Sequence, residues 1–337
     1  MAKVRLLVHL GPMKTGTSSF AYHFSRLASA GKLPQSVIYP TGELWFPARG
    51  EIVKHHDLVE LALAPLNASG ERRRSTDATP ALIRGRLSAI VAEATTRVGD
   101  VRVVMVCEIG DQRATPKLGK VLREYFDSVD FVIVARDQPS AIRSLIAQQI
   151  RMWDRTDGTA LDSNAFTRKH AARGSYDYAR LWDKWNTGAE DYSVHFVPYR
   201  SGVDTTDLSQ DVFSAAGFGD FPHSPDLSNG ERIHSTFSHK RMSDLATIKS
   251  WALRFGMIPG APGLCRWLFH FVVRRAHAEI KRNAIQPSDT WTLSPAEHSF
   301  IVEKYRTSNK QFREKLGAEG NNARWTEWFA RTLDPVT

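Results

Sequence analysis

The stretch "LLVHLGPMKTGTSSF", Leu6 to Phe20, decides the fold. It reads as an apolar strand, a glycine-containing turn and the start of a helix, which is the arrangement of a phosphate-binding loop. Gly11 and Gly16 have the separation of the two glycines in the G-x-x-x-x-G-K-[ST] pattern, but the lysine is displaced. Thr17 follows Gly16, and Lys14 lies inside the loop. The backbone amides of this loop and the N-terminus of the following helix can still enclose an anion.

Strands alternate with helices along most of the chain. The apolar runs predict strands at 4–10, 37–39, 101–106, 131–135 and 192–199, and the intervening patterns predict helices at 17–30, 79–98, 116–126, 139–153 and 175–185. We expect a loop at 41–54, a helix at 55–66 and mainly helices after 199. Such alternation is typical of a central parallel sheet with helices on both faces. The fold class is therefore α/β with helical C-terminal additions. We expect one domain, with a core at about 3–220 and a basic part at about 225–335.

Two of these helices show which of their faces is buried. Phe20, Phe24 and Leu27 share one side of the first helix. In the helix at 175–185, an aromatic and apolar stripe is formed by Tyr178, Leu181, Trp182 and Trp185. Thr79 precedes Pro80 in the arrangement of an N-cap followed by a proline at the first helical position.

The composition is that of a water-soluble globular protein. Hydrophobic residues make up 42% and charged residues 24% of 337 residues, so the chain can bury a core without disulfides. Two cysteines, Cys107 and Cys265, indicate a reducing compartment. No secretory signal is recognisable, and the longest apolar stretch, 251–273, is interrupted by arginines and prolines. We expect a cytoplasmic protein.

The net charge of +9 is concentrated in one part of the chain. Between Arg232 and Arg282, ten lysines and arginines stand against two acids. This window is either a solvated basic face or a contact for an anionic glycan, nucleotide or membrane surface. Within it, "RWLFHFVVRRAHAEIKR" reads as a core helix with a basic outer face or as a helix at a membrane interface. No nucleic-acid motif is recognisable.

The first loop resembles a known family. Strand, "GPMKTGTSS" and helix are similar to the 5′-phosphosulfate loop of sulfotransferases that use 3′-phosphoadenosine 5′-phosphosulfate (PAPS). The family's K-[ST]-G-[ST]-[ST] run stands here as Lys14-Thr15-Gly16-Thr17-Ser18, with Ser19 as a further hydroxyl. The resemblance implies a P-loop NTPase-like sulfotransferase fold, PAPS as donor, 3′-phosphoadenosine 5′-phosphate as product, and no metal.

A second segment, "FVIVARDQPSAIRSLIAQQ", also matches the family. Arg136 ends a strand and Ser144 follows eight residues later on the next helix, which is how relatives contact the 3′-phosphate. An arginine fork and a serine hydroxyl both suit phosphate; the alternative is that Arg136 binds a carboxylate. Tyr199 matches a tyrosine near the cofactor base in some relatives, although a core or edge tyrosine fits equally.

The resemblance extends from about Val4 to Gly317, where "RTSNKQFREKLG" is similar to the closing helix of bacterial homologues. It fails at "NGERIHSTFSHKR", where relatives carry other sequences. Arg232, Lys240 or Arg241 can supply the remaining charge at the 3′-phosphate, and the sequence does not distinguish them.

The implied reaction is transfer of a sulfuryl group to a hydroxyl or amine. By analogy with phosphoryl transfer, positioning and charge stabilisation dominate. Lys14 is expected to stabilise the leaving phosphate, and Thr17 and Ser18 to hold the 5′-phosphate. The base that accepts the acceptor's proton is Glu108, which follows the strand at 101–106, or else a histidine of "KHHDL", His55 or His56.

Two other classes of function remain open. A P-loop kinase using ATP and Mg²⁺ on a small-molecule hydroxyl would need a lysine after Gly16 and an aspartate at a strand end, where this sequence has Glu108 and Arg136. A non-catalytic module for an anionic glycan or membrane would use the basic window. For a sulfotransferase, we expect the acceptor to be a glycan, a lipid-linked sugar or a metabolite, and the basic C-terminal part is a candidate for peripheral membrane contact.

Overall fold

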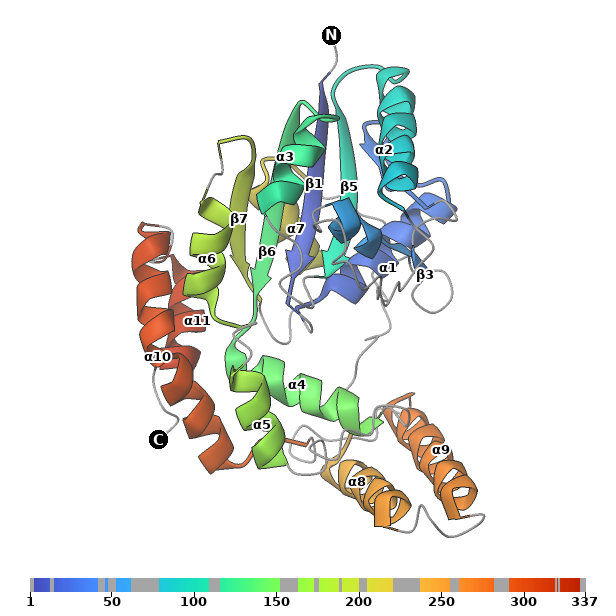
Figure 1. Ribbon diagram of the computed structural model, residues 1–337, viewed down its shortest axis with the longest axis vertical. Coiled ribbons are helices and arrows are strands. Elements are labelled where there is room, and N and C mark those ends of the chain that lie inside the picture. Colours follow the sequence, from blue (N-terminus) through green and yellow to red (C-terminus); the bar gives the residue numbers. More distant parts are fainter. Residues whose placement is uncertain are drawn as a thin grey trace, which may run out of the picture. The chain divides into compact units, whose positions relative to one another are not determined.

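The computed structural model describes residues 3–12, 15–41, 46–47, 53–61, 79–108, 116–151, 163–172, 176–187, 190–199, 205–220, 237–254, 261–281, 291–318, 320 and 322–333 (Figure 1). Lys14 and Arg232, both expected at the nucleotide site, lie outside these ranges, as does the side chain of Glu108.

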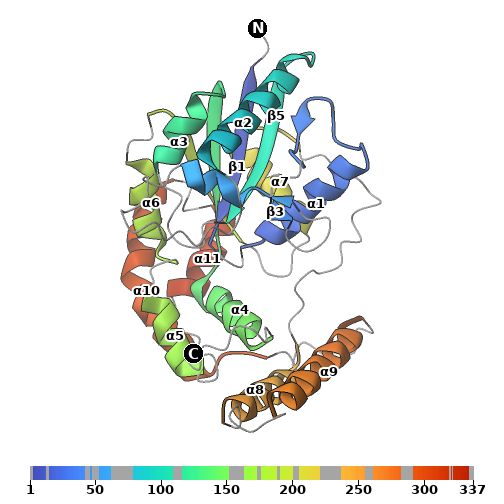
Figure 2. The ribbon, with the colours of Figure 1, turned by 45° about the vertical axis from the view of Figure 1, so that its right-hand side comes forward.

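A parallel five-stranded sheet forms the centre of the α/β fold, as the sequence predicts (Figures 1 and 2). Its order is β2-β5-β1-β6-β7. The strands are β1 (Val4–Gly11), β2 (Val37–Ile38), β5 (Val101–Glu108), β6 (Ser128–Ala135) and β7 (Ser193–Pro198). The chain runs from β1 to the edge strand β2, returns to β5 beside β1, and then crosses to β6 and β7. The direction in which strands are added therefore changes at β1, which makes its carboxyl end a topological switch point.

Helices cover both faces of this sheet. They are α1 (Thr17–Ser29), α2 (Pro80–Thr95), α3 (Pro116–Arg123), α6 (Tyr178–Asn186) and α7 (Thr205–Ala215). Residues of α1 and α7 pack on the face that carries Leu7 and Val132. On the other face, Phe131 contacts Trp185 of α6 at a ring distance of 4.8 Å. The alternation of side chains along β6 thus places α1 and α7 opposite α6.

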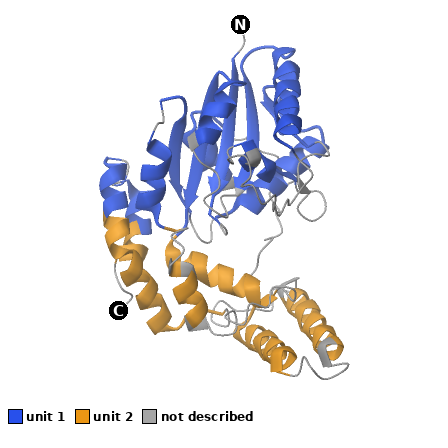
Figure 3. Cartoon of the chain, viewed as in Figure 1, with its two compact units in different colours: residues 1–136, 177–233, 311–328 blue, residues 137–176, 234–310, 329–337 orange. Residues whose placement is uncertain are grey.

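The described residues divide into two compact units (Figure 3). Unit 1 comprises Met1–Arg136, Asp177–Ile233 and Gln311–Trp328 and contains the sheet. Unit 2 comprises Asp137–Tyr176, His234–Lys310 and Phe329–Thr337. The interpretation of the chain as one domain stays a prediction.

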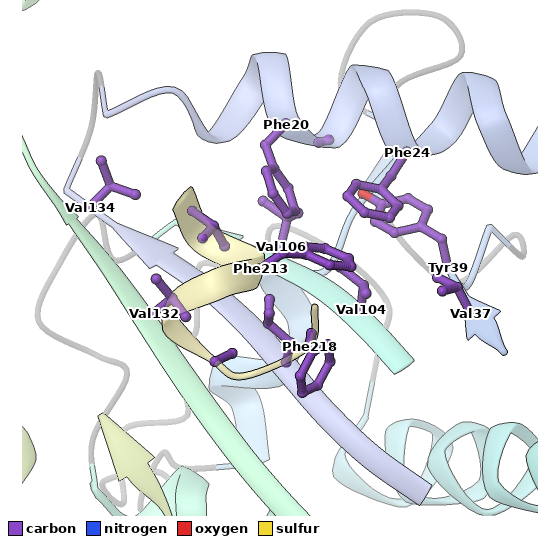
Figure 4. Close-up of a cluster of buried hydrophobic side chains, with 14 of the residues drawn as sticks. Phe20, Phe24, Val37, Tyr39, Val104, Val106, Val132, Val134, Phe213 and Phe218 are labelled. Carbon is purple, nitrogen blue, oxygen red and sulfur yellow. The ribbon is translucent and has the colours of Figure 1, made fainter. Parts of the chain in front are cut away.

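A cluster of aromatic and branched side chains fixes α1 to the sheet (Figure 4). Phe24 lies at the centre of its aromatic part. Its ring stacks on Tyr39 at 5.2 Å and on Phe213 of α7 at 5.6 Å, and Phe20 lies 4.9 Å away. The predicted face of α1, including Leu27, is buried. Replacement of such a core phenylalanine by alanine typically lowers the free energy of unfolding by about 3–5 kcal/mol. The packing of Phe24 therefore fixes α1, and with it the first loop, at the edge of the sheet.

Most of the described residues of unit 2 are helical. Its elements are α4 (Gln138–Arg151), α5 (Ser163–Ala172), α8 (His239–Arg254) and α9 (Ala261–Lys281), with parts of α10 (Pro295–Leu316) and α11 (Ala323–Leu333). Gln138 and Asn309, both buried, exchange side-chain hydrogen bonds of 2.7 and 3.2 Å. Arg241 of α8 binds Glu279 of α9 and thereby joins these two helices. The helical C-terminal part matches the sequence prediction.

The segment at 41–66 differs from its prediction. Instead of loop alone, it contains the short antiparallel strands β3 (Phe46–Pro47) and β4 (Val53–Lys54). The expected helix at 55–66 is a 3-10 helix, η1 (His56–Leu61), and residues 62–66 lie outside the described ranges. His55 directly precedes η1: its carbonyl oxygen accepts from the Leu58 amide at 3.2 Å, and its own backbone N–H donates to the carbonyl oxygen of Val106 of β5 at 2.7 Å.

Candidate functional site

The expected site residues of unit 1 emerge from neighbouring strands at one edge of the sheet. Gly11 at the end of β1 is in register with Glu108, the last residue of β5. On the other side of β1, β6 ends at Ala135, in register with Pro198 of β7. Arg136 and Tyr199 are therefore the next residues along these two strands. Ligands of open α/β sheets bind at such carboxyl ends, at the switch point.

The described part of the first loop has the predicted turn and helix start. The buried hydroxyl of Thr15 donates to the carbonyl oxygen of Pro12 at 2.7 Å. A Cβ on Gly11 would lie 2.1 Å from the Thr15 Oγ1, so this position needs glycine. Gly16 is the N-cap of α1 with a left-handed φ of 87°. It offers no side-chain cap, and the first turn of α1 contains no acidic residue.

The first amides of α1 thus point to a binding place for an anion. The first N–H groups of a helix have no carbonyl partner within the helix, and its N-terminus carries a partial positive charge. Of the predicted hydroxyl residues here, Thr17 is buried, whereas Ser18 and Ser19 are partly exposed.

A lysine that sequence reasoning missed lies at this helix start. The Lys54 ammonium donates to Ser18 Oγ at 2.8 Å, and only 6% of the residue is exposed. His9 of β1 is buried beneath α1, with its ring 4.7 Å from the ring of Phe20. Burial, reinforced by the Lys54 charge, lowers the pKa of His9 to about 3. Neither ring nitrogen of His9 has a hydrogen-bond partner among the described residues.

Arg136 is held by a network that fixes its backbone. The Tyr178 hydroxyl accepts from the Arg136 amide at 2.9 Å and donates to the Arg136 carbonyl oxygen at 2.8 Å. The preceding carbonyl, of Ala135, accepts from the Tyr199 amide at 2.7 Å and from the Trp328 indole at 3.0 Å. The strand end that presents the Arg136 guanidinium is therefore rigidly anchored.

The Tyr199 ring connects Arg136 with the first loop. The guanidinium carbon of Arg136 lies 4.7 Å from the ring centroid. A Cβ built on Gly16 would lie 3.5 Å from Cε2 of the same ring. Loop, tyrosine and arginine thus form one constellation within unit 1.

His55 and His56, the two histidines of "KHHDL", differ in burial. His55 is fully buried, its Nε2 lies 2.9 Å from the Pro40 carbonyl oxygen, and its Nδ1 accepts from the Val106 amide at 3.0 Å. Burial is the main cause that lowers its pKa to about 3. Because both nitrogens bind the backbone, this geometry favours a structural role over that of a base. His56 is partly exposed at the start of η1, and its catalytic role stays a prediction.

The remaining expected residues lie in unit 2. Ser144 is on α4 and partly buried, so its pairing with Arg136 stays a prediction. Lys240 is exposed on α8. Arg241 binds Glu279 and Asp244, which makes it a poor candidate for a phosphate contact.

One face of α9 combines exposed apolar and basic side chains. Leu264, Trp267 and Phe271 are 61%, 57% and 39% exposed. The Trp267 and Phe271 rings stack at 5.8 Å, and the Arg275 guanidinium lies 5.5 Å from the Phe271 ring. Within the described ranges, no helix combines the length and hydropathy needed to cross a membrane. The same ranges contain no group of histidines, cysteines and acids suited to a metal ion.

No family model matches this sequence, and no curated protein matches it.

Proposed function

We propose that this protein is a sulfotransferase with a P-loop NTPase-like fold that uses PAPS as the sulfuryl donor. The observation that carries the proposal is the constellation at the switch point of the sheet. The N-terminus of α1, whose N-cap Gly16 has no side chain, the Lys54 ammonium and the Arg136 guanidinium offer positive charge. The Tyr199 ring adjoins both the loop and the arginine.

These groups fit the chemistry of the donor. PAPS carries phosphate on two different oxygens of its ribose, so it needs two anion contacts with space for a nucleoside between them. The start of α1 suits the 5′-phosphosulfate, and Arg136 suits the 3′-phosphate because its planar fork binds phosphate well. Tyr199 offers an aromatic face for the nucleoside.

In the reaction, PAPS supplies an activated sulfuryl group whose bond to the 5′-phosphate breaks as a bond to the acceptor oxygen or nitrogen forms. The amides of α1 and the hydroxyls of Thr17 and Ser18 hold the phosphate that departs. Lys14 supplies charge there, as the resemblance implies. Glu108 or His56 takes the acceptor's proton, and the β5 terminus places the Glu108 backbone beside Gly11.

A kinase that uses ATP is the alternative from another class of reaction. The sequence favours the sulfotransferase because the position after Gly16 is Thr17 rather than a lysine, and because the residue that follows β6 is Arg136 rather than an aspartate. A triphosphate chain needs contiguous contacts, whereas Arg136 stands at a different strand end from the loop.

The acceptor and the place of action belong to the same proposal. We propose a hydroxyl- or amine-bearing glycan, lipid-linked sugar or metabolite as acceptor, in the cytoplasm. The aromatic and basic face of α9 supports contact with an anionic membrane surface, since such helices lie at the interface with their apolar side chains among the headgroups.

Calorimetric titration with 3′-phosphoadenosine 5′-phosphate tests the proposal, with ATP and Mg²⁺ as the competing ligand. We expect micromolar binding of the bisphosphate, weakened about 10- to 100-fold in Arg136→Ala and in Lys14→Ala, since each loses a charge-assisted contact. Arg84→Ala removes an exposed arginine of α2 and serves as control. Binding of ATP without binding of the bisphosphate would refute the sulfotransferase and favour a kinase.

A further inference from the structure

Lys54 is held in place from three directions. The Val53 amide donates to Ser25 Oγ of α1 at 2.9 Å, and the Tyr39 hydroxyl donates to the Val53 carbonyl oxygen at 2.6 Å. On the other side, His55 is bonded through backbone and ring to Val106 of β5. These contacts fix the backbone on both sides of Lys54, so the ammonium position at the start of α1 is built into the fold.

The charge of Lys54 lies where a cation is normally disfavoured. Helix N-termini attract anions and repel cations, by about 0.3–1 kcal/mol at exposed positions. The first turn of α1 nevertheless lacks an acidic residue and receives an ammonium on Ser18. Two positive fields thus converge at the start of one helix. An anion bound at this place would interact favourably with both of them.

The hydrogen bond from Lys54 also prepares the Ser18 hydroxyl. A serine hydroxyl has one donor and two acceptor lone pairs. Because Ser18 Oγ accepts from an ammonium, one lone pair is occupied and its O–H is polarised as a donor. Lys54 would therefore act on a bound anion both through its own charge and through the serine hydroxyl.

We propose that Lys54, together with Ser18, binds the phosphate at the 5′ end of the nucleotide, as a cationic contact that comes from outside the loop. This inference rests on the proposed function, and it assigns Lys54 to the 5′ end as Arg136 is assigned to the 3′ end. Neither the loop pattern nor the resemblance identifies this lysine, which lies 36 residues after Ser18.

Three ligands distinguish the contacts at the 5′ end of the site from those at the 3′ end. Adenosine 5′-phosphate reports the 5′ contacts, adenosine 3′-phosphate reports the 3′ contacts, and the bisphosphate reports both. In Lys54→Met, which keeps a long apolar side chain, we expect the affinities for the bisphosphate and the 5′-phosphate to fall by the same factor, about 10- to 100-fold, with unchanged affinity for the 3′-phosphate. Arg136→Ala should show the opposite pattern. Lys120→Met, at an exposed position of α3, is the matched control.

Ser18→Ala provides a second variant at a partly exposed position, where folding is less at risk. It should weaken the two 5′-phosphorylated ligands selectively, and the loss in the double variant should be smaller than the sum of both single losses. Lys54→Arg should retain most of the affinity.

The outcomes distinguish the two proposals. If the wild-type protein does not bind the bisphosphate, the proposed function fails. If it binds and Lys54→Met binds equally well, the assignment of Lys54 fails while the function stands. If Lys54→Met weakens all three ligands equally, or Ser18→Ala shows no selectivity for the 5′ end, the lysine supports the fold rather than the phosphate, and the inference is overturned.

Discussion

Acidification should destabilise this protein through two buried histidines. His9 and His55 are fully buried in unit 1, and burial is the main cause that lowers each pKa from 6.5 to about 3. In the unfolded chain both titrate near the ordinary value, so below about pH 6.5 the unfolded state binds more protons than the folded state. The stability present above this pH is therefore lost as the pH falls from about 6.5 toward 3.

The size of this effect follows from proton linkage. Each histidine that stays neutral in the folded state reduces the free energy of unfolding by about 2 kcal/mol between pH 7.5 and pH 5.0. His9 and His55 together contribute about 4 kcal/mol, a large part of the stability of a typical domain. Replacement of His9 by Phe removes one ionisable group and should halve this contribution.

Urea unfolding at several pH values, followed by tryptophan fluorescence, measures the difference. The comparison is between the pH dependence of the variant and that of the wild type, not between their absolute stabilities. Leu10→Met is the matched control, since Leu10 is equally buried on β1 and carries no ionisable group. If His9→Phe loses as much stability on acidification as the wild type and the control do, His9 is not held neutral by burial and the reasoning is wrong.

Three further changes have definite expected results. Gly16→Ala places a Cβ at a φ of 87° and 2.6 Å from a leucine methyl, so urea unfolding should show a loss of about 1–3 kcal/mol, larger than for Gly31→Ala, which meets no atom within 4 Å. Tyr178→Phe removes both hydrogen bonds to the Arg136 backbone. Calorimetry should show weaker binding of adenosine 3′-phosphate and unchanged binding of adenosine 5′-phosphate. An equal loss of affinity for the two ligands would contradict a role of Tyr178 in positioning Arg136. The protein should sediment with vesicles that contain phosphatidylserine and should not sediment with vesicles of phosphatidylcholine alone. Trp267→Ser should weaken this binding, since Trp267 is exposed on α9. Equal binding to both kinds of vesicle would argue against the proposed membrane contact.

The sheet was predictable because its signal is local. Runs such as 101–106 and 131–135 are apolar on both faces, as buried parallel strands require, and both form central strands. The N-cap of α2 was also local, and the Thr79 hydroxyl accepts from the Leu82 amide as expected. By contrast, β4 consists of Val53 and Lys54 alone, in a segment whose Pro47 and Gly50 indicate a loop, so the sequence does not predict it.

The partners of buried polar groups could not be predicted from the sequence. Tyr178 belongs to an aromatic stripe that is recognisable as buried, but its hydroxyl binds a backbone 42 residues earlier in the chain. Lys54 likewise shows no sign in the sequence that it reaches Ser18. One sign was present: His9 is the only polar residue between Leu6 and Leu10, and an interrupted apolar strand indicates a group with a special environment. The sequence pattern indicates which side chains are buried, whereas the hydrogen-bond partner of a buried polar side chain depends on tertiary contacts.

The displaced lysine of the first loop has a counterpart elsewhere in the site. In the G-x-x-x-x-G-K-[ST] pattern, the lysine starts the helix and reaches along a phosphate chain. Here Thr17 occupies that position, and a lysine from β4 reaches the helix start at Ser18 instead. The second cation, Arg136, comes from the end of β6 and stands beside Tyr199. Charge supplied from two separate strand ends suits a nucleotide with phosphates on two ribose oxygens better than a linear triphosphate. The distribution of cations, more than the loop itself, therefore favours a bisphosphorylated nucleotide.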